Sequence, residues 1–347
     1  MQETLGLLAG GGSLSEAAAE ETFCALLRGE FDEAQIGALL AMLASRGPTT
    51  DELVGAARAM RAFVTPVPVA QSARDGLVDT CGTGGAPKTF NISTGAAIVA
   101  AAAGAVAGSE PGGVHVRVAK HGNRSRTGRG SAEVLMQLGI NVDASPETQA
   151  TCLEEAGVCF CFAIHHHPAM RYAVGPRKSL GFPTIFNLLG PLTNPAGAER
   201  QLLGVYAEDK AALVAEALQR LGAARAIVAH GDDGMDEITS TTTTSMFHVE
   251  RGSSVQRASL DPASLGLHAA TLDDLRVETL EDAASVIRDV VGGTPGPARE
   301  IVELNAAAAL HVGGAAATLE EGLERARAAI DAGAAKTTLE LLSATSA

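Results

Sequence analysis

Aromatic residues are scarce in this 347-residue chain, which has no Trp, two Tyr and nine Phe, together 3% of the sequence. A protein that stacks nucleic-acid bases on aromatic side chains would need more of them. Positive charge is also in short supply, because 26 Lys and Arg stand against 40 Asp and Glu, for a net charge of −14. Since non-specific binding to nucleic acid depends on cations that neutralise phosphates, this balance argues against that function.

Long apolar runs and paired cysteines are missing too. The most apolar run, 96–107, is mostly Ala and is too short to cross a membrane, which takes about 20 residues. The N-terminal sequence MQETLGLLAG lacks the basic start and apolar stretch of a signal peptide. The five Cys are odd in number and follow no secreted pattern. We therefore expect a cytoplasmic protein with reduced thiols and no membrane partner.

What is present is a globular composition, with 46% hydrophobic residues and 39 Gly. The length suggests two domains, and the core must be built from small and aliphatic side chains. Residues 1–68 are expected to form a helical domain, with helices opening at Ser13–Glu16 through a capping box, at Asp32, and at Thr50 or Asp51. Two prolines, at 66 and 68, mark a linker. This domain carries little reactive chemistry, so we expect a packing or dimerisation role.

From about residue 75 short apolar runs alternate with helical segments. The expected strands cover 77–81, 114–119, 158–164, 202–205 and 226–229, and the helices between them cover 94–107, 131–138, about 168 onward and 209–221. Such alternation predicts a mostly parallel sheet flanked by helices, with ligands bound beyond the strand C-termini. The polar run Thr239–Thr244 is rich in β-branched residues and is expected to be a strand. The last third, from about 279, again reads as helical. The predicted class is thus α/β, with a small all-helical domain beside a larger domain at 75–347.

Charge is unevenly distributed along the chain. The window 86–130 holds one acid, Glu110, and six cations: Lys88, Arg117, Lys120, Arg124, Arg126 and Arg129. The window 226–250 holds no Lys or Arg and five acids: Asp232, Asp233, Asp236, Glu237 and Glu250. An acidic chain with one basic and one purely acidic window calls for a local explanation.

The basic window contains two expected anion sites. In the first, a strand is followed by Gly82, Gly84 and Gly85 and then by a helix near Ser93, so that backbone N–H groups and a helix N-terminus face one loop. This loop fits neither the P-loop nor the dinucleotide-binding spacing, and a plain capped turn is the alternative. In the second, the run from Lys120 to Ser131 places four cations among glycines that disfavour a helix, which indicates a polyanionic ligand rather than a solvated basic loop: Lys120, Arg124, Arg126 and Arg129.

Two more motifs follow strands. The acidic loop His230–Glu237 offers hard oxygen ligands suited to Mg²⁺; alone it would be a solvated turn, but beside a polyphosphate site a Mg²⁺ bridge is the better interpretation. Cys159, Cys161 and the trio His165–His167 raise the possibility of zinc, although histidines lining a substrate pocket are a better interpretation. Arg177 lies on the following helix and is placed to bind a substrate carboxylate.

These motifs together resemble anthranilate phosphoribosyltransferase. The resemblance covers the chain in order and rests on residues 82–85 and 91–94, Lys120-His-Gly-Asn-Arg124, 130–133, Arg177-Lys178, the run Thr184–Pro195 and the loop 230–237. It implies the second step of tryptophan biosynthesis, in which anthranilate and phosphoribosyl pyrophosphate (PRPP) give phosphoribosylanthranilate and pyrophosphate. It also implies the nucleoside phosphorylase and phosphoribosyltransferase type of fold, in which residues from about 168 to 190 join the helical domain. The resemblance further implies a homodimer formed through that domain and two Mg²⁺ ions per monomer.

The resemblance assigns roles position by position. The PRPP-binding residues it implies are Gly82, Gly85, Ala86, Thr89, Asn91, Ile92, Ser93, Thr94, Lys120, His121, Gly122, Asn123, Arg124 and Ser131. The anthranilate-binding residues are Gly82, Asn123, Arg177, His121 and His166, and the metal ligands are Ser93, Asp236 and Glu237. No general base is assigned.

Three departures from the family pattern stand out. Ala86 stands where the family commonly has Asp, and its loop is one residue shorter than the family pattern. Either a contact to PRPP or to the metal is lost, or Lys88 supplies a different contact. The loop from Arg124 to Ser131 is also one residue shorter, and about 11 extra residues lie near 105–115, where we expect a surface extension far from the site. A pyrimidine nucleoside phosphorylase-like enzyme and a non-catalytic nucleic-acid-binding relative are the alternative functions, against which the Asp236–Glu237 pair and the net charge respectively argue.

Overall fold

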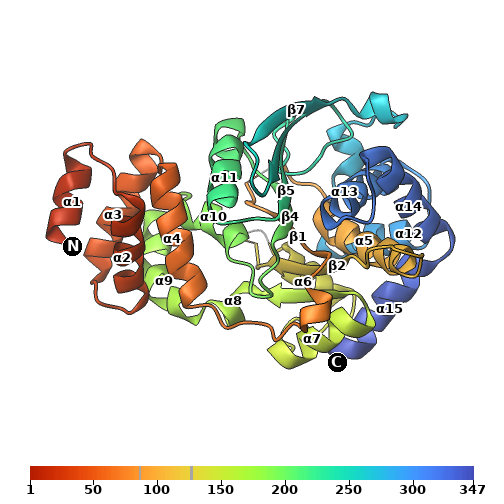
Figure 1. Ribbon diagram of the computed structural model, residues 1–347, viewed down its shortest axis with the longest axis horizontal. Helices are drawn as coiled ribbons and strands as arrows, with labels where there is room; N and C mark the ends of the chain where they lie inside the picture. Colours follow the sequence, from red (N-terminus) through yellow and green to blue (C-terminus); the bar gives the residue numbers. More distant parts are fainter. Residues whose placement is uncertain (86, 126–127) are drawn as a thin grey trace.

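The computed structural model describes residues 1–85, 87–125 and 128–347. Figure 1 shows a narrow helical lobe on the left and a broader lobe built around a sheet on the right. The helical lobe begins with four helices, α1 (Gln2–Ala9), α2 (Glu16–Leu27), α3 (Glu33–Arg46) and α4 (Thr50–Ala62). Its predicted all-helical character is confirmed. The residue bounds of the two domains, 1–68 and 75–347, stay predictions.

Side-chain caps set where these helices begin. Asp32 accepts a hydrogen bond from the Gln35 backbone N–H at 2.8 Å and forms the start predicted there. Thr49 caps α4 in the same way, one residue before the expected position. The capping box predicted at Ser13 is wrong, because Ser15 is the N-cap of α2 and its hydroxyl accepts from the Ala18 N–H. The helix therefore begins at the second serine of the pair.

A seven-stranded sheet forms the centre of the larger lobe, in the order β3-β2-β1-β4-β5-β6-β7. The strands are β1 (Leu77–Gly82), β2 (Arg117–Gly122), β3 (Val158–Phe162), β4 (Arg200–Gly204), β5 (Arg225–Gly231), β6 (Thr244–Glu250) and β7 (Gln256–Leu260). The first five pair in parallel, whereas β6 and β7 pair antiparallel at one edge. The mostly parallel sheet is thus confirmed, and the glycine, basic and acidic loops all follow the carboxyl ends of its parallel strands.

The polar run at Thr239–Thr244 corrects a prediction. Only Thr244 belongs to a strand, since β6 begins there. The hydroxyl groups of Thr239 and Thr241 instead donate hydrogen bonds to one carboxylate oxygen of Asp233, the former at 2.6 Å. The β-branched residues thereby hold the acidic loop in a compact turn, and side-chain hydrogen bonds of this kind compete with strand pairing.

The sheet buries both faces, and on β4 and β5 successive residues enter different cores. On β4 Leu202 packs into one core and Leu203 into the other, and on β5 Ile227 and Val228 divide in the same way. The first core lies under five helices: α5 (Ile92–Gly108), α12 (Leu280–Val291), α13 (Pro297–Gly313), α14 (Leu319–Asp331) and α15 (Ala334–Ser346). Two shorter helices complete this layer, α6 (Ser131–Gln137) against α12 and α7 (Pro146–Glu155) against β3. Alanine and glycine let α5 approach the sheet closely: a Cβ at Gly104 would lie 2.4 Å from the Val116 carbonyl oxygen.

The second core joins the two lobes. It includes α11 (Glu208–Arg220) on the sheet, the helices α2–α4, and two later helices, α9 (Arg171–Leu180) and α10 (Ile185–Leu189). The Phe186 ring of α10 meets the Phe23 ring of α2 edge to face, with centroids 5.8 Å apart. Segment 171–189 thus packs in the helical lobe beside α4, as Figure 1 shows. The sequence had led us to expect that residues from about 168 to 190 would join this lobe.

The extra residues near 105–115 connect the end of α5 to the start of β2. They therefore lie at the amino end of the parallel strands, away from the motif-bearing loops, as expected. Arg325 of α14 binds Glu110 through two hydrogen bonds of 3.0 Å, which fixes this loop to the helical layer. Among the described helices, none combines the length and apolarity needed to cross a membrane.

One close approach between β4 and the acidic loop yields a prediction. A Cβ at Gly204 would lie 1.6 Å from the backbone oxygen of Asp236, so the strand end must be glycine for this loop to pass over it. We expect Gly204→Ala to lower the free energy of unfolding by about 2 kcal/mol or more. Urea unfolding measures this, with Gly190→Ala as control, because nothing lies within 4 Å of the position of its added methyl group. Equal stability of the two variants would contradict the close approach.

Candidate functional site

The glycine loop after β1 lies directly against the acidic loop. The backbone N–H of Gly84 donates to Asp236 Oδ2 at 2.8 Å, and a Cβ at Gly82 would lie 2.5 Å from that same oxygen. The Ser93 N–H, in the first turn of α5, donates to Glu237 Oε1 at 3.2 Å. Two motifs separated by about 150 positions in the sequence thus form one wall.

Lys120 is the buried cation of this wall. Its Nζ donates to the Thr80 carbonyl oxygen at 2.7 Å and to the Ser93 hydroxyl at 3.0 Å. Burial lowers the pKa of this amine, while the nearby carboxylates, Glu237 foremost, act in the opposite direction. A buried ammonium group held by only two neutral acceptors is well suited to meet an incoming anion.

The two carboxylates opposite Lys120 have perturbed acidities. Burial, and next the charge of Asp236, raise the pKa of Glu237 to about 8, and burial also raises the pKa of Asp236. Both groups are therefore destabilised as anions in the free protein. A bound cation that makes direct contact would stabilise them.

Two buried polar atoms at the start of α5 have no partner. The Asn91 Oδ1 and Thr94 Oγ1 atoms are enclosed without a hydrogen bond, although Asn91 Nδ2 donates to the Arg129 carbonyl oxygen at 3.2 Å. Unsatisfied buried groups are costly, and they are commonly matched by a ligand or ordered water. Their location at a helix N-terminus, where N–H groups also point outward, favours a ligand that carries oxyanions.

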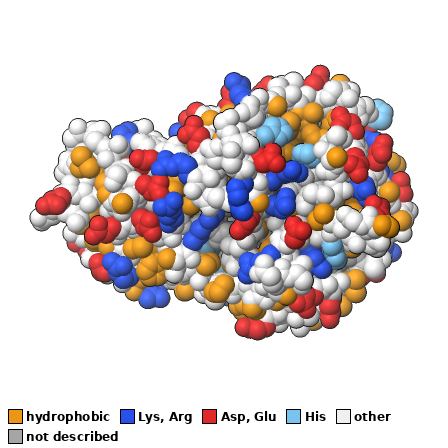
Figure 2. Space-filling model, viewed as in Figure 1, with side chains coloured by type: hydrophobic (Ala, Val, Ile, Leu, Met, Phe, Trp, Pro, Cys, Tyr) orange, Lys and Arg blue, Asp and Glu red, His pale blue; other side chains and the backbone are white. Residues whose placement is uncertain are grey.

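A cavity of about 570 Å³ joins these groups. It is lined by 24 residues, and they include these predicted PRPP and metal residues: Gly82, Gly85, Thr89, Asn91, Ile92, Ser93, Lys120, His121, Gly122, Asn123, Arg124, Ser131, Asp236 and Glu237. Thr94 lies just beneath the lining and is buried. Ala86 and Arg126 are outside the described residues. Figure 2 shows Lys and Arg side chains gathered around the hollowed middle of this face.

The basic loop contributes less free charge than its composition suggests. Arg129 donates through Nη1 to the Val277 carbonyl oxygen, so its guanidinium is turned to the protein. Arg124 lies over the Phe162 ring, 5.7 Å from its centroid, and lines the cavity. Lys120, Arg124 and Arg129 all line the first cavity, but Arg129 has one guanidinium nitrogen committed to the Val277 carbonyl oxygen.

A second cavity, also of about 570 Å³, opens from the first toward the helical lobe. The two share the lining residues Gly82, Thr83, His121, Gly122, Asn123, Arg124 and Asn187. Its further walls come from Met60 of α4, Met170, and Val174 and Arg177 of α9. The second cavity thus lies between the lobes, whereas the first is lined mainly by the sheet domain, with Asn187 of α10 at the shared boundary.

Three arginines line the second cavity, Arg124, Arg171 and Arg177. The Arg177 guanidinium lies over the Phe186 ring, 5.3 Å from the centroid, and burial lowers its pKa. An arginine stacked on an aromatic ring keeps its edge N–H groups available. The cavity consequently offers apolar walls and guanidinium groups, which fit a small aromatic carboxylate.

Two histidines from different loops meet in this cavity. His121 Nδ1 pairs with the Gly190 carbonyl oxygen at 3.0 Å, and its Nε2 lies 3.2 Å from His167 Nε2. Nδ1 of His121 must be the protonated nitrogen, because a carbonyl oxygen only accepts; His167 then donates to His121 Nε2. Burial lowers the pKa of His167 to about 4 and that of His121 well below its ordinary value, so both rings are neutral at pH 7.

The structure corrects the placement of His166. Its ring is fully buried between the Thr65 carbonyl oxygen, 2.7 Å from Nδ1, and Gln149 Oε1, 2.9 Å from Nε2, and it does not line the cavity. His167 takes the expected position instead. The sequence trio carried no signal that distinguishes the three, because the turn after α8 (Ala163–His166) decides which ring faces inward.

Sequence reasoning also missed Asn187 and Pro191. Asn187 lines both cavities and Pro191 lines the second, and both belong to the run Thr184–Pro195 that had been noted for resemblance alone. Zinc at Cys159, Cys161 and His165–His167, the less favoured interpretation of that motif, finds no support, since the described residues contain no group of three or more His, Cys, Asp or Glu placed to hold a metal ion. All five cysteines are free.

Comparisons with known proteins agree over the whole chain. Residues 2–64 match the helical bundle domain of a glycosyl transferase family, and residues 74–336 match the a/b domain of a glycosyl transferase family. An anthranilate phosphoribosyltransferase from Methylococcus capsulatus is 45% identical over 99% of this chain and 97% of its own length. One from Moorella thermoacetica is 47% identical over 96% of this chain and 94% of its own.

Solved structures show the same fold. The crystal structure of anthranilate phosphoribosyltransferase from Thermus thermophilus is 39% identical and superposes with a TM-score of 0.89, covering 99% of this chain and 98% of that one. A Saccharomyces cerevisiae enzyme in complex with PRPP and Mg, 23% identical, has a TM-score of 0.87 over 99% of this chain and 97% of its own. With relatives this similar over nearly the full length, the chain belongs to the anthranilate phosphoribosyltransferase family.

Proposed function

We propose that this protein transfers the 5-phosphoribosyl group of PRPP to the amino group of anthranilate, releasing pyrophosphate. One observation carries the proposal: two contiguous cavities share a floor, one with a buried ammonium and two carboxylates, the other with guanidinium groups and apolar walls. The first cavity fits a phosphorylated donor, and the second cavity fits an aromatic acid. The relatives that are 45% and 47% identical carry the name of this activity.

The first cavity supports binding of PRPP. Its phosphate partners would be the Ser93 and Asn91 side chains, Lys120 Nζ, Arg124 and the backbone N–H groups of the glycine loop. Nothing in the described loop corresponds to the Asp that Ala86 replaces, but Lys88 lines the cavity and is available to a phosphate there. Arg and Lys in such a cleft raise the local concentration of anions within a protein of net charge −14.

The residues present also fit Mg²⁺. Asp236 and Glu237 supply two hard carboxylate ligands on the cavity wall, and burial raises the pKa of both, so a bound cation would stabilise their charged forms. When bound, Mg²⁺ would neutralise charge on the phosphates of PRPP and on the leaving pyrophosphate. We propose two ions per monomer, one held by Asp236 and Glu237 and the other touched by the Ser93 hydroxyl.

The second cavity supports binding of anthranilate. Its carboxylate would pair with Arg177, and Asn123 and His121 lie where the shared floor brings the amino group toward the ribose. Because both histidines are neutral, they present a polar surface without adding a cation that would compete with Arg177. His167 holds His121 in one tautomer, so that the ring does not reorient as the substrate enters.

Catalysis would then come mainly from positioning and electrostatics. The amine nitrogen attacks ribose C1, the bond from C1 to the pyrophosphate oxygen breaks, and the electron pair leaves with pyrophosphate. The nitrogen loses its proton after attack, which a weakly basic aromatic amine does readily without a dedicated base. Charge built up on the leaving group lies beside Lys120, which is already buried and needs little reorganisation.

The alternative functions fit less well. A nucleoside phosphorylase that uses inorganic phosphate has no evident use for paired carboxylates that face a phosphate cavity. A nucleic-acid-binding role conflicts with a chain in which acids outnumber cations by 40 to 26. We also infer a homodimer through the helical domain, supported by the exposed side chains of Leu7, Val174 and Phe182 there. A cytoplasmic location is consistent with five free cysteines.

The carboxylate partner of anthranilate can be tested directly. Arg177→Ala removes one guanidinium of the second cavity, so we expect the KM for anthranilate to rise about 10- to 100-fold, while the KM for PRPP changes little. Anthranilate fluorescence loss measures both constants. Lys178→Ala is the matched control, since that exposed neighbour does not line the cavity. Equal losses for the two substrates would refute the assignment.

The metal ligands are tested by a change that preserves shape. In Asp236→Asn combined with Glu237→Gln, neutral amides replace both anions, and we expect turnover to fall at least about 100-fold, with its dependence on Mg²⁺ concentration weakened. Asp232→Asn, an exposed acid in the same loop, should retain wild-type kinetics. A double variant with an unchanged Mg²⁺ titration curve would rule out this ligand pair.

The neutral histidine pair predicts a pH dependence of stability. The pKa of His167 is about 4 in the folded protein and about 6.5 when unfolded, so the unfolded state takes up the proton first as pH falls. Stability from this group is intact above pH 6.5, and lowering the pH from 7 to 5 removes about 2 kcal/mol. Urea unfolding at both pH values measures this. Between pH 7 and pH 5 the free energy of unfolding should fall by about 2 kcal/mol less in His167→Gln than in the wild type. His165→Gln, an exposed ring, should behave as wild type; identical pH slopes in all three proteins would contradict the prediction.

A further inference from the structure

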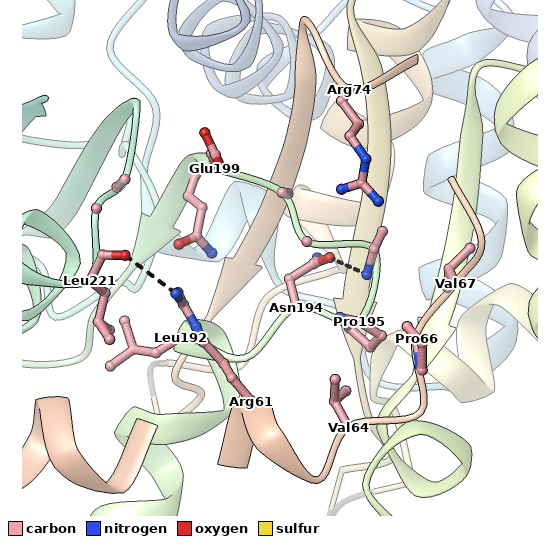
Figure 3. Close-up of a pocket in the computed structure, with 16 residues that line it drawn as sticks. Arg61, Val64, Pro66, Val67, Arg74, Leu192, Asn194, Pro195, Glu199 and Leu221 are labelled. Carbon is pink, nitrogen blue, oxygen red and sulfur yellow. Dashed lines mark hydrogen bonds between the residues drawn. The ribbon is translucent and has the colours of Figure 1, made fainter. Parts of the chain in front are cut away.

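A third cavity, of about 360 Å³, lies at the hinge between the two lobes and shares no lining residue with the substrate cavities. Figure 3 shows its walls. Arg61, Val64, Pro66 and Val67 come from the end of α4 and the linker that follows it, and the facing wall is the loop 192–199 before β4. Arg74, Gln201 and the turn 221–223 complete it.

The cavity carries excess positive charge. Arg61 donates from Nε to the Leu192 carbonyl oxygen at 2.8 Å and weakly from Nη1 to that of Leu221 at 3.4 Å, and both acceptors are neutral. Glu199, the acid of the lining, already pairs with Arg251 at 2.7 Å. Arg74 makes no side-chain hydrogen bond or ion pair with any described residue. In Figure 3 the Arg74 side chain extends toward the loop at Pro195 from the side opposite Arg61.

The remaining walls are apolar. Val64 and Pro66 of the linker face Leu192 and Pro195 of the loop, with Leu221 beside them. An inorganic anion would leave these surfaces in contact with water, whereas an organic anion would cover them. Burying one small ring against such walls stabilises a complex, because apolar surface is removed from water. The volume lies within the usual range of small-molecule sites.

The position of the cavity connects it to the substrate site. Gln201, on its floor, donates to the Pro191 carbonyl oxygen at 2.7 Å, and Pro191 lines the second cavity. Asn194 donates to the Ala119 carbonyl oxygen at 2.8 Å, next to Lys120. The linker itself is tied to the loop by one hydrogen bond, from the Val67 N–H to the Pro195 carbonyl oxygen at 3.1 Å. A ligand that bridges linker and loop would therefore contact both lobes where they join.

We propose that this hinge cavity is a regulatory site for a small organic carboxylate, whose anionic group lies between Arg61 and Arg74 and whose apolar body packs on the linker and the loop. Such a ligand binds one relative arrangement of the lobes better than others and so changes the affinity of the interlobe cavity for its own substrate. The proposal concerns a site separate from the reaction, and its test does not need turnover.

Calorimetric titration with benzoate tests it. The background is Arg177→Ala, which weakens the substrate cavity as a competing carboxylate site, and the dependence on Arg74 separates the hinge cavity from the arginines that remain there, Arg124 and Arg171. We expect saturable benzoate binding in this protein and at least a tenfold weaker affinity when Arg74→Gln is added, since the exposed Arg74 supports no other part of the fold. Arg276→Gln is the matched control, an exposed arginine that pairs with Asp273 outside all three cavities and should leave the affinity unchanged.

Two further arms separate the sources of binding. Inorganic phosphate should bind at least tenfold more weakly than benzoate, because it leaves the apolar walls uncovered; equal affinity would overturn the organic-carboxylate assignment. In the otherwise wild-type enzyme, Arg74→Gln should abolish any effect of benzoate on the KM for PRPP, while competition with anthranilate at Arg177 persists. Absence of binding in the Arg177→Ala background, or binding that does not depend on Arg74, would overturn the hinge site itself.

Discussion

The charge balance around the Lys120 amine is the constraint on which the site depends. The buried ammonium group is held by a carbonyl and a hydroxyl oxygen and lies near three poorly solvated carboxylates, those of Glu237, Asp79 and Asp236. Asp79 is held by the His121 backbone N–H, whereas Lys120, Asp236 and Glu237 line the cavity, where an anion and a cation would each find an oppositely charged partner. The glycines at 82 and 204 serve this arrangement, since their missing side chains let the acidic loop lie against the strand ends.

The division of the chain into two lobes follows from the same sheet. Alternating residues of β4 and β5 supply one face to the alanine-rich helices and the other to a core that continues into the helical lobe. The phosphate-type cavity is built mainly from loops of the sheet domain, with Asn187 at its boundary, whereas the aromatic-acid cavity and the hinge cavity each draw several walls from both lobes. Movement between the lobes would therefore alter the latter two more than the first.

Much of this could be read from the sequence, because local rules decide it. Hydrophobic alternation located the parallel strands, and the parallel arrangement in turn placed every loop motif at one edge of the sheet. The capping serine of α2 and the threonine run after the acidic loop were misjudged. Two serines stand close together before α2 and only Ser15 caps it, and the threonine hydroxyls bind Asp233, which no local pattern shows. Which histidine of three consecutive rings faces the cavity depended on a tight turn and on the distant partners Thr65 and Gln149, which no local pattern encodes.

The antiparallel edge of the sheet has a consequence for solubility. β7 is the last strand, and four of its five residues, Gln256 to Ser259, are exposed. An open edge is a template on which another chain can add a strand, and polar or charged side chains there discourage it. Here the edge presents glutamine, arginine and serine, with Arg257 tied to Glu208. The same short hairpin that ends the parallel order therefore also protects an alanine-rich, highly apolar protein from joining its copies edge to edge.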